Sequence, residues 1–279
     1  MSDEMISIND RGFLLGDGIF DTSMVLNSRM MFRDRHLKRL MDAAEALDIA
    51  VETNDVETAI DRAIEGVEAG RLRVSVSRPF DGSPGAPIRT QVTSLDATRQ
   101  FQPVRAITSD IARLPGAPSA QYKTLSYIDN VEALRRALTK GADTALMLNA
   151  FGRPASGAME NLFILEDTKL VTPPTEEGVL AGTLRAWVLD EASEAGLTVE
   201  EATLSVERLA SADAVFLTNS LRLIAPVWSL DDNTLLTKWP SALVDLAHHL
   251  LHAIKGQCEM RTPFGRPRYN DPLPGETAI

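Results

Sequence analysis

Lys123 is the residue whose side chain offers the most distinctive chemistry in this sequence. It opens the segment KTLSYID (123–129), which follows the loop-like RLPGAPSAQY and precedes the helical VEALRRALTKG. A lysine amine can form an imine with a carbonyl group, which fixes its position covalently and leaves it as a base once the imine is exchanged. Most lysines are surface charges, so the position alone leaves both interpretations of Lys123 open.

Two further segments have the features of an anion site. In GVLAGTLRAWV a predicted helix begins at Thr183 and Leu184, where backbone N–H groups lack partners inside the helix and the helix dipole favours negative charge. The segment FLTNSLRLIAPV is a strand-to-turn junction that offers hydroxyl, amide and backbone donors at Thr218, Asn219 and Ser220. Each segment alone is equally typical of an ordinary helix cap or turn.

Arg39 could add a charged clamp to such a site. It lies on the polar side of the predicted helix RHLKRLMDAAEALDI, whose apolar stripe includes Leu37, Leu40 and Met41. Alone, this arginine is more typical of a surface charge. A reactive lysine combined with a phosphate-binding site, however, indicates pyridoxal 5'-phosphate (PLP) as the cofactor.

The elements that must position these residues alternate between strand-like and helix-like segments, which predicts a mixed α/β architecture. Strands are expected at MISIN, GIFDTSMVLN, RMMF, LRVSVSR, VRAITSD, TALMLNA, NLFILED, KLVTP and AVFLTNS. Helices are expected at RHLKRLMDAAEALDI, DVETAIDRAIEGVEAG, VEALRRALTKG, TLRAWVLDEASEAG and SALVDLAHHLLHAIKG.

The Pro/Gly-rich segment ARLPGAPSAQ interrupts this pattern and is the best candidate for an interdomain linker. We therefore predict an N-terminal α/β domain over 1–113, a linker over 114–121 and a C-terminal PLP-binding domain over 122–254. Residues 255–279 form a Pro-rich tail with little periodicity, which we expect to be extended or partly disordered.

Charge and composition limit the partners. The formal net charge is −11 and no Lys/Arg-rich run is present, so we do not expect nucleic acid as a partner. The first residues lack a secretory signal pattern, and no apolar run approaches the roughly 20 residues of a membrane span, so we expect a cytoplasmic protein that does not enter a membrane. His248, His249 and His252 lie on an amphipathic helix without a suitable carboxylate motif, which predicts a solvated face rather than a metal site.

Seven segments together resemble the class IV, or fold type IV, PLP-dependent aminotransferases. In the family's order they are DRGFLLGDGIFDT, FRDRHLKRL, VSVSR, YKTLSYIDNV, ENLFIL, LAGTLR and DAVFLTNSLRLIAPV. The family includes branched-chain aminotransferases, D-amino-acid aminotransferases, (R)-amine transaminases and aminodeoxychorismate lyases. Any one of these segments is weak evidence for the family, whereas the set of seven in this order is specific to it. The resemblance implies the two-domain fold type IV architecture, PLP as cofactor and a homodimer.

The resemblance also implies a role for each matched residue. It makes Lys123 the Schiff-base lysine and catalytic acid/base, and Arg39 the phosphate-binding arginine. The other implied cofactor contacts are the backbone of Thr183 and Leu184, the turn with Thr218, Asn219 and Ser220, and Tyr127 beside the phenolic oxygen of the cofactor. Phe20 is implied to line the substrate pocket, and Arg78, at the end of VSVSR, is either a second pocket residue or a structural ion-pair residue.

Ser156 is the main departure from the family. The family normally has a glutamate five residues before the Asn of its N-[LIV]-F motif, where it protonates the pyridine nitrogen; counting back from Asn161 gives Ser156. A hydroxyl can only donate a hydrogen bond to a neutral nitrogen, which makes the ring a weaker electron sink. Either Glu160 reaches the nitrogen from a shifted loop, or Ser156 contacts it, alone or with water.

A second departure concerns the substrate carboxylate. D-amino-acid enzymes of the family use an Arg and a His after the strand that corresponds to VSVSR, and SRPFDGSPGAPIR has neither at the matching spacing. Arg89 lies nearby but out of register, so a standard D-amino-acid specificity is not expected.

The predicted function is PLP-dependent transfer of an amino group between a small amino donor and a 2-oxo acid through a Schiff base on Lys123. The first alternative is an aminodeoxychorismate lyase-like enzyme that releases pyruvate, since Ser156 favours chemistry that needs less charge delocalisation. The second is a catalytically weakened PLP-binding protein.

Overall fold

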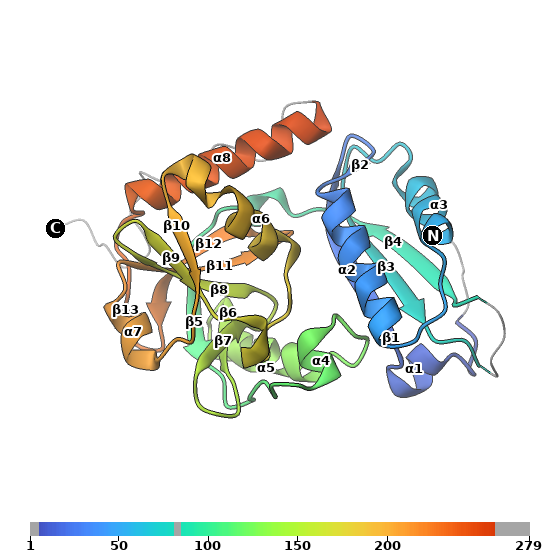
Figure 1. The fold of residues 1–279 in the computed structure, drawn as a ribbon, viewed down its shortest axis with the longest axis horizontal. Coiled ribbons are helices and arrows are strands. Elements are labelled where there is room, and N and C mark those ends of the chain that lie inside the picture. The colour runs from blue at the N-terminus through green and yellow to red at the C-terminus, as the bar shows by residue number, and fades with distance from the viewer. Residues whose placement is uncertain (1–5, 81–84, 260–279) are drawn as a thin grey trace. The chain divides into compact units, whose positions relative to one another are not determined.

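The computed structural model describes residues 6–80 and 85–259, and the chain packs as two compact units (Figure 1). The N-terminal unit comprises residues 1–95 together with 122–127, and the C-terminal unit comprises residues 96–121 together with 128–279.

The N-terminal unit is built on a four-stranded antiparallel sheet with the order β2-β1-β3-β4. Its elements are α1 (Arg11–Leu15), β1 (Gly18–Leu26), β2 (Arg29–Met30), α2 (Arg33–Ala46), α3 (Thr53–Ile64), β3 (Ala69–Ser77) and β4 (Ile88–Thr93). The apolar residues of β3, namely Leu72, Val74 and Val76, alternate with polar ones and pack with the apolar stripes of α2 and α3. Because successive strand residues point to opposite faces, the polar residues of β3 occupy the other face of the sheet.

The segment 122–127 joins this sheet at the edge of β1. The N–H of Phe20 donates to the carbonyl of Lys123 at 2.8 Å, and the N–H of Leu125 donates to the carbonyl of Gly18 at 2.8 Å. Thr124 lies opposite Ile19 in this short antiparallel bridge. Backbone pairing with β1 therefore fixes the position of Lys123.

The C-terminal unit contains a nine-stranded mixed sheet. Its strands are β5 (Val104–Thr108), β6 (Thr144–Leu148), β7 (Pro154–Gly157), β8 (Asn161–Glu166), β9 (Lys169–Thr172), β10 (Thr198–Glu201), β11 (Ala214–Asn219), β12 (Leu223–Leu230) and β13 (Asn233–Thr234). The order is β10-β9-β8-β11-β12-β5-β6-β7, with β13 on β12, and β7 also pairs with β8. That last pairing closes the strands from β8 to β7 into a barrel-like ring with an apolar core.

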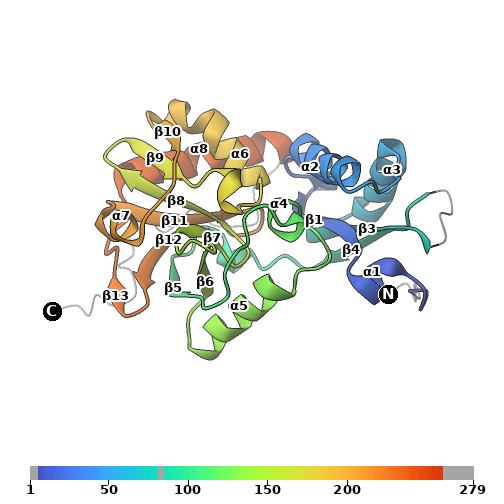
Figure 2. The same cartoon turned by 60° about the horizontal axis from the view of Figure 1, so that its bottom comes forward.

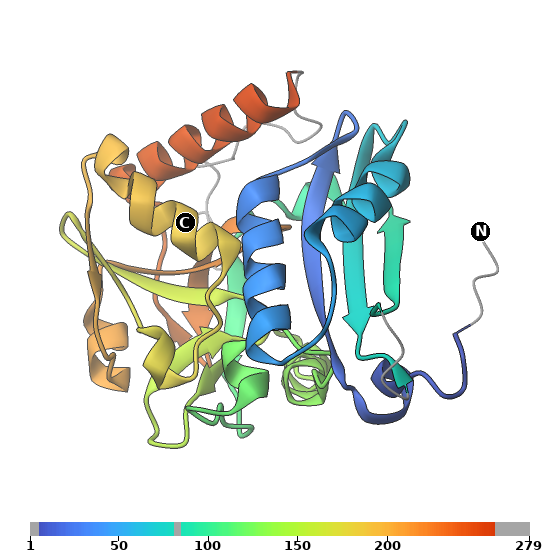
Figure 3. The same cartoon turned by 45° about the vertical axis from the view of Figure 1, so that its right-hand side comes forward.

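Helices cover this barrel-like sheet. They are α4 (Pro118–Gln121), α5 (Ile128–Thr139), α6 (Thr183–Glu191), α7 (Val206–Ser211) and α8 (Ser241–Cys258). Figure 2 shows α5 on the side of the sheet away from α6 and α8. Figure 3 shows α8 beside α6, where the rings of Trp187 and His249 lie 5.4 Å apart.

The structure confirms the mixed α/β architecture and a helix in each of the five expected segments. The second of these was expected to continue to Gly70, but α3 ends at Ile64, and Ala69 and Gly70 belong to β3. The expected strand MISIN is wrong for its described residues, because Ile6–Asn9 contain a turn and no strand. The strands β4, β7, β10, β12 and β13 were not predicted. α4 lies within 114–121, α8 continues to Cys258, and residues 260–279 of the predicted tail lie outside the described residues.

No helix in the described part of the chain is both long and apolar enough to span a membrane. Of the three histidines on α8, His248 and His252 are exposed, whereas His249 contacts Glu191 through Nε2 at 3.2 Å.

Candidate active site

Lys123 lies against two aromatic rings of its own unit. Its Nζ is 4.4 Å from the ring centroid of Phe20 and 4.9 Å from that of Tyr127. The two rings meet edge to face, with centroids 5.1 Å apart and an interplanar angle of 85°. The structure therefore brings together three residues that the sequence predicted for the cofactor and substrate site. The aromatic walls keep the amine in a fixed, half-buried position, as a residue that forms a covalent bond requires.

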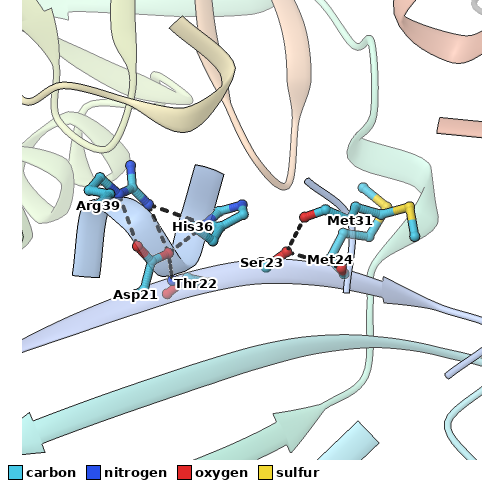
Figure 4. A network of polar contacts seen from close by, with 7 residues as sticks. All are labelled: Asp21, Thr22, Ser23, Met24, Met31, His36 and Arg39. Atoms are coloured by element: carbon cyan, nitrogen blue, oxygen red, sulfur yellow. Dashed lines mark hydrogen bonds and ion pairs between the residues drawn. The ribbon is translucent and has the colours of Figure 1, made fainter. Parts of the chain in front are cut away.

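A buried polar cluster links β1 to α2 on the helix side of the same sheet (Figure 4). Asp21 accepts hydrogen bonds from Nε and Nη2 of Arg39 at 2.9 and 2.8 Å, and its Oδ1 lies 2.7 Å from Nδ1 of His36. Burial by itself would raise the pKa of the Asp21 carboxyl, but the charges and hydrogen bonds of Arg39 and His36 outweigh it and hold that pKa well below its usual value. Burial lowers the pKa of His36 despite the opposing effect of Asp21. The cluster therefore contains an Asp21–Arg39 ion pair beside a neutral imidazole.

This cluster determines which nitrogen atoms of Arg39 can still donate a hydrogen bond to a phosphate group. Nε and Nη2 are engaged by Asp21, while Nη1 makes no hydrogen bond to any residue in the described parts of the chain. The side chain is only 14% exposed. Arg39 is therefore a rigidly held guanidinium with one nitrogen still able to donate, and its role as a phosphate ligand stays a prediction. No local sequence pattern indicated that Asp21 and His36 would contact Arg39.

In the C-terminal unit, α6 begins in the way that an anion site requires. Gly182 is the N-cap residue and no side chain caps the helix. The N–H groups in the first turn of a helix have no carbonyl partners inside the helix, and they point toward the position where an anion binds. A methyl group at Gly182 would clash with Oδ1 of Asn161, whose Nδ2 donates to the carbonyl of Leu180 at 2.8 Å. The close approach of β8 therefore requires a glycine at this position. Thr183 and Leu184 are both buried in the first turn.

Ser156, Asn161 and Thr218 form a row across three neighbouring strands. Ser156 of β7 is paired with Asn161 of β8, which is paired with Thr218 of β11. Residues opposite each other in antiparallel strands point to the same face, with Cβ atoms about 5 Å apart. The hydroxyl of Thr218 is buried and has no hydrogen-bond partner within the described residues. The sheet thus brings two predicted cofactor residues to one place, beside the start of α6 through Asn161.

The chemistry of the side chains in this row suits the binding of a phosphate group and of a ring nitrogen. A buried hydroxyl without a partner loses hydrogen-bond energy, and a ligand oxygen that accepts its proton would restore it. The side chain of Asn219, in contrast, stabilises the turn in which it lies. Its Oδ1 accepts hydrogen bonds from the N–H groups of Leu221 at 2.9 Å and Arg222 at 2.7 Å. Ser220 lies half-buried in the same turn.

Glu160, the alternative to Ser156, is engaged by its own turn. Its Oε2 accepts from Thr144 Oγ1 and from the N–H of Met159, both at 3.0 Å, and its Oε1 lies 4.0 Å from Nε of Arg222. The carboxylate therefore already has polar partners in the folded chain.

Arg78 occupies a structural position. Its Nε lies 3.1 Å from Oδ2 of Asp17, and its Nη2 donates to the carbonyl of Leu47 at 2.6 Å. These are the contacts of the structural ion-pair residue that the sequence left as one of two interpretations. Arg89 likewise pairs with Asp10, at 2.7 Å.

Arg73 is the residue of this region that sequence reasoning missed. Its guanidinium carbon lies 3.7 Å from the ring centroid of Phe20. The alternation RLRVSVS placed Arg73 on the polar face of a strand, but only the pairing of β3 with β1 brings it to Phe20.

Comparisons with known proteins agree with the family that the sequence motifs resemble. The family model for "Amino-transferase class IV" matches residues 18–230. The chain is 26% identical to a D-alanine aminotransferase of Bacillus licheniformis over 251 residues, which cover 85% of this chain and 87% of that protein. It is 27% identical to a bifunctional aminodeoxychorismate lyase / D-amino acid transaminase of Mycobacterium tuberculosis, over 83% of this chain and 88% of that protein. The solved structure of a hypothetical aminotransferase from M. tuberculosis in its PLP-bound form has a TM-score of 0.83 and 27% identity, and the match covers 92% of this chain and 96% of that one.

Proposed function

The chain belongs to the class IV aminotransferases, and from that premise we propose that it transfers an amino group between a small amino donor and a 2-oxo acid. The observation that carries this proposal is the position of Lys123, whose amine lies against the rings of Phe20 and Tyr127. PLP is the cofactor of this family, and when bound it supplies the electron sink that stabilises negative charge on the donor's Cα.

Each residue has a defined task in this proposal. Lys123 would hold the cofactor through its amine, and once the donor's amine displaces that amine, Nζ would be free to take the proton from the Cα of the donor and hold it for return. The backbone N–H groups of Thr183 and Leu184 and the hydroxyls of Thr218 and Ser220 would hold the phosphate oxygens, and Nη1 of Arg39 would be a charged donor. Tyr127 would donate to the phenolic oxygen of the cofactor, and Phe20 would orient the substrate.

Ser156 is proposed as the partner of the pyridine nitrogen. Its position in the row with Asn161 and Thr218 supports this role, as do the contacts that already engage the Glu160 carboxylate. A hydroxyl leaves the ring nitrogen neutral, so transamination is expected to be slow for the family.

The same hydroxyl favours a second candidate function, an aminodeoxychorismate lyase-like reaction that releases pyruvate. Loss of a leaving group needs less charge delocalisation than a complete amino transfer does, so a weaker electron sink harms it less. The family relationship accommodates both activities, as the bifunctional relative shows for its own sequence.

A donor panel followed by visible spectroscopy tests these proposals. Purified holoenzyme is mixed with D- and L-amino acids, (R)-amines and aminodeoxychorismate. Conversion of the cofactor to its pyridoxamine form supports transamination, and pyruvate release without that conversion supports the lyase. A spectrum that no donor changes would leave only a PLP-binding protein.

Borohydride trapping tests the role of Lys123 directly. Reduction should attach the cofactor irreversibly to Lys123, as peptide mass spectrometry can show. The Lys140→Ala variant, which removes an exposed lysine of the same chain, should be trapped like the wild type, whereas Lys123→Ala should not. Attachment at any other lysine would contradict the proposal.

We also propose, on the family relationship, that the enzyme is a homodimer. The exposed apolar side chains of α1 support this proposal.

A further inference from the structure

We propose that Arg113 is a positioning residue for Lys123. Its buried guanidinium binds both flanks of the segment that carries the lysine, and it thereby sets how firmly the amine is held for reaction. The role of Arg113 rests on the function proposed above, because Lys123 is the residue that it positions. Arg113 lies outside the seven segments that resemble the family.

The main chain of Arg113 is fixed within the C-terminal unit. Its N–H donates to the carbonyl of Leu148 at 2.8 Å, and its carbonyl accepts from the N–H of Ala150 at 2.9 Å, so it pairs with the chain at the end of β6. The residue is only 7% exposed. A buried guanidinium is costly unless its N–H groups find acceptors, so the acceptors of this side chain are part of the folded structure.

Two of these acceptors lie on either side of Lys123 in the chain. Nη2 of Arg113 donates to the carbonyl of Ala120 at 2.8 Å, and Nη1 donates to Oδ1 of Asn130 at 3.0 Å. Ala120 belongs to the end of α4, where carbonyls lack partners inside the helix, and Asn130 belongs to the first turn of α5. One guanidinium therefore joins the end of α4 to the start of α5, and residues 121–129 span the interval between these two fixed points.

The same group of contacts reaches two further segments with predicted cofactor residues. Nε of Arg113 donates to the carbonyl of Gly178 at 3.0 Å, four residues before the N-cap of α6. Because Oδ1 of Asn130 accepts from Arg113, its Nδ2 is directed to donate, and it binds the carbonyl of Ala158 at 2.6 Å, two residues after Ser156. Arg113 and Asn130 are both buried, so water does not compete strongly for these bonds.

The anchored flanks bear on the reaction through the precision with which the amine is held. A reacting group must stay within about 0.5 Å of its productive position, and a displacement of about 1 Å can cost roughly 100-fold in rate. Backbone bonds between Phe20 and Lys123 and between Leu125 and Gly18 hold the middle of the segment. Without Arg113 only this short pairing restrains it, and Nζ samples a wider range of positions.

The first experiment measures hydrogen–deuterium exchange in the full-length protein, with and without PLP. The amide of Leu125, which donates to Gly18, reports how firmly residues 122–127 are held. The variants are Arg113→Met, Arg113→Lys and Asn130→Ala. Asn130→Ala keeps the guanidinium and removes only its bond to α5, so it tests the anchor even if Arg113→Met does not fold.

Arg105→Gln is the matched control. Nη1 of Arg105 donates to the carbonyl of Lys140 at 3.2 Å, so this arginine also binds a carbonyl at a helix end, but at the end of α5 that is remote in the chain from Lys123. Its loss should leave exchange in residues 122–127 at the wild-type rate.

The second experiment measures how fast Lys123 of the PLP-free protein combines with PLP and with pyridoxal, which lacks the phosphate group. Borohydride is added at successive times, and peptide mass spectrometry gives the fraction attached to Lys123. A donor that the wild type converts then gives kcat and KM for the PLP-loaded variants.

We expect Arg113→Met to speed exchange in residues 122–127 at least about tenfold, with little change in β8 and β11. Attachment of PLP and of pyridoxal should slow by similar factors, roughly 10- to 100-fold, and kcat should fall more than KM rises. Asn130→Ala should show the same pattern with smaller changes. Arg113→Lys should recover part of the loss, because an ammonium group keeps the charge but cannot reproduce the planar fork.

Wild-type exchange and wild-type attachment rates in folded Arg113→Met and Asn130→Ala would overturn the inference. Slower attachment of PLP alone would also overturn it, since that result places the effect at the phosphate group. A uniform rise of exchange across the C-terminal unit would show a general structural role instead. If Lys123 of the wild type does not combine with PLP, or if no donor is converted, the proposed function fails, while exchange in residues 122–127 still decides whether Arg113 holds that segment.

Discussion

At the scale of single residues, the proposed contact of Ser156 with the pyridine nitrogen predicts how strongly the bound cofactor can withdraw electrons. It is buried on β7 and paired with Asn161, so a glutamate placed there would bring a carboxylate to the same row of side chains. We predict that Ser156→Glu protonates the ring nitrogen and speeds the amino-transfer half-reaction by at least about tenfold, which corresponds to about 1.4 kcal/mol. Nitrogen-15 NMR of labelled cofactor measures the protonation directly.

Glu160→Gln is the control for that experiment. Because the Glu160 carboxylate is engaged by Thr144 and the N–H of Met159, its loss should leave the ring-nitrogen signal in place. A shifted signal in Glu160→Gln together with an unchanged one in Ser156→Glu would identify Glu160 as the ring partner instead.

His36 gives the protein a predictable pH dependence of stability. Burial lowers its pKa in the folded state, so the unfolded chain binds the proton more readily. The stabilising contribution is present above the unfolded pKa of about 6.5 and is lost as pH falls from there toward the folded pKa, at about 1.4 kcal/mol per unit of pKa shift. Thermal midpoints measured from pH 8 to pH 5 should fall more steeply in the wild type than in His36→Gln.

His249→Gln is the matched histidine control, since His249 lies half-exposed on α8. It should keep the steep pH dependence of the wild type. Equal slopes in the wild type and in His36→Gln would show that His36 does not titrate between the folded and unfolded states.

At the scale of elements, the helices were predictable and several strands were not. α2, α3, α5 and α8 each carry an apolar stripe with helical spacing, which local sequence displays. β7 is four residues long, contains Pro154, and is defined by its pairing with β6 and β8. β12 contains Pro226, whose type argues against a strand interior. Tertiary pairing, which the local pattern does not encode, determines both.

The start of α6 can be tested as an element. Gly182→Ala would place a methyl group against Oδ1 of Asn161, so β8 and the helix start must move apart. We predict that this substitution weakens PLP binding roughly 10- to 100-fold, because the helix N–H groups lose their alignment with the row of Ser156 and Thr218. Fluorescence titration of apoenzyme with PLP measures the effect.

Gly256→Ala is the control for the glycine substitution. Gly256 lies in α8, where an added methyl group meets no neighbouring atom, so alanine should raise the thermal midpoint slightly through its higher helix propensity. PLP affinity equal to the wild type in both variants would show that α6 does not bind the phosphate.

At the scale of the whole molecule, the predicted cofactor residues are distributed over both units, with Lys123, Tyr127 and Arg39 in the N-terminal unit and the remainder in the C-terminal unit. Sequence reasoning could name them as candidates because each lies in a short motif with its own local signature. Arg73 and Asp21 escaped it because their contacts depend on which strand or helix packs beside them. Motifs thus indicate candidate cofactor residues more readily than the residues that pack around them.

The proposed homodimer needs an exposed apolar interface, and we predict that α1 forms part of it. This helix buries none of its residues, and Phe13, Leu14 and Leu15 are each more than half exposed, as is Ile8 just before it. Contiguous exposed apolar side chains of this kind mark interaction surfaces, and a stable interface buries roughly 1,000 Å² or more. We predict that light scattering after size exclusion gives twice the 30.4 kDa mass of the chain, and that Phe13→Asp together with Leu15→Asp shifts the mass toward one chain. The control is Leu138→Asp, an exposed leucine on α5, which should leave the mass unchanged. A wild-type mass of one chain would contradict the homodimer, whereas a dimer that survives both α1 substitutions would place the interface on another surface.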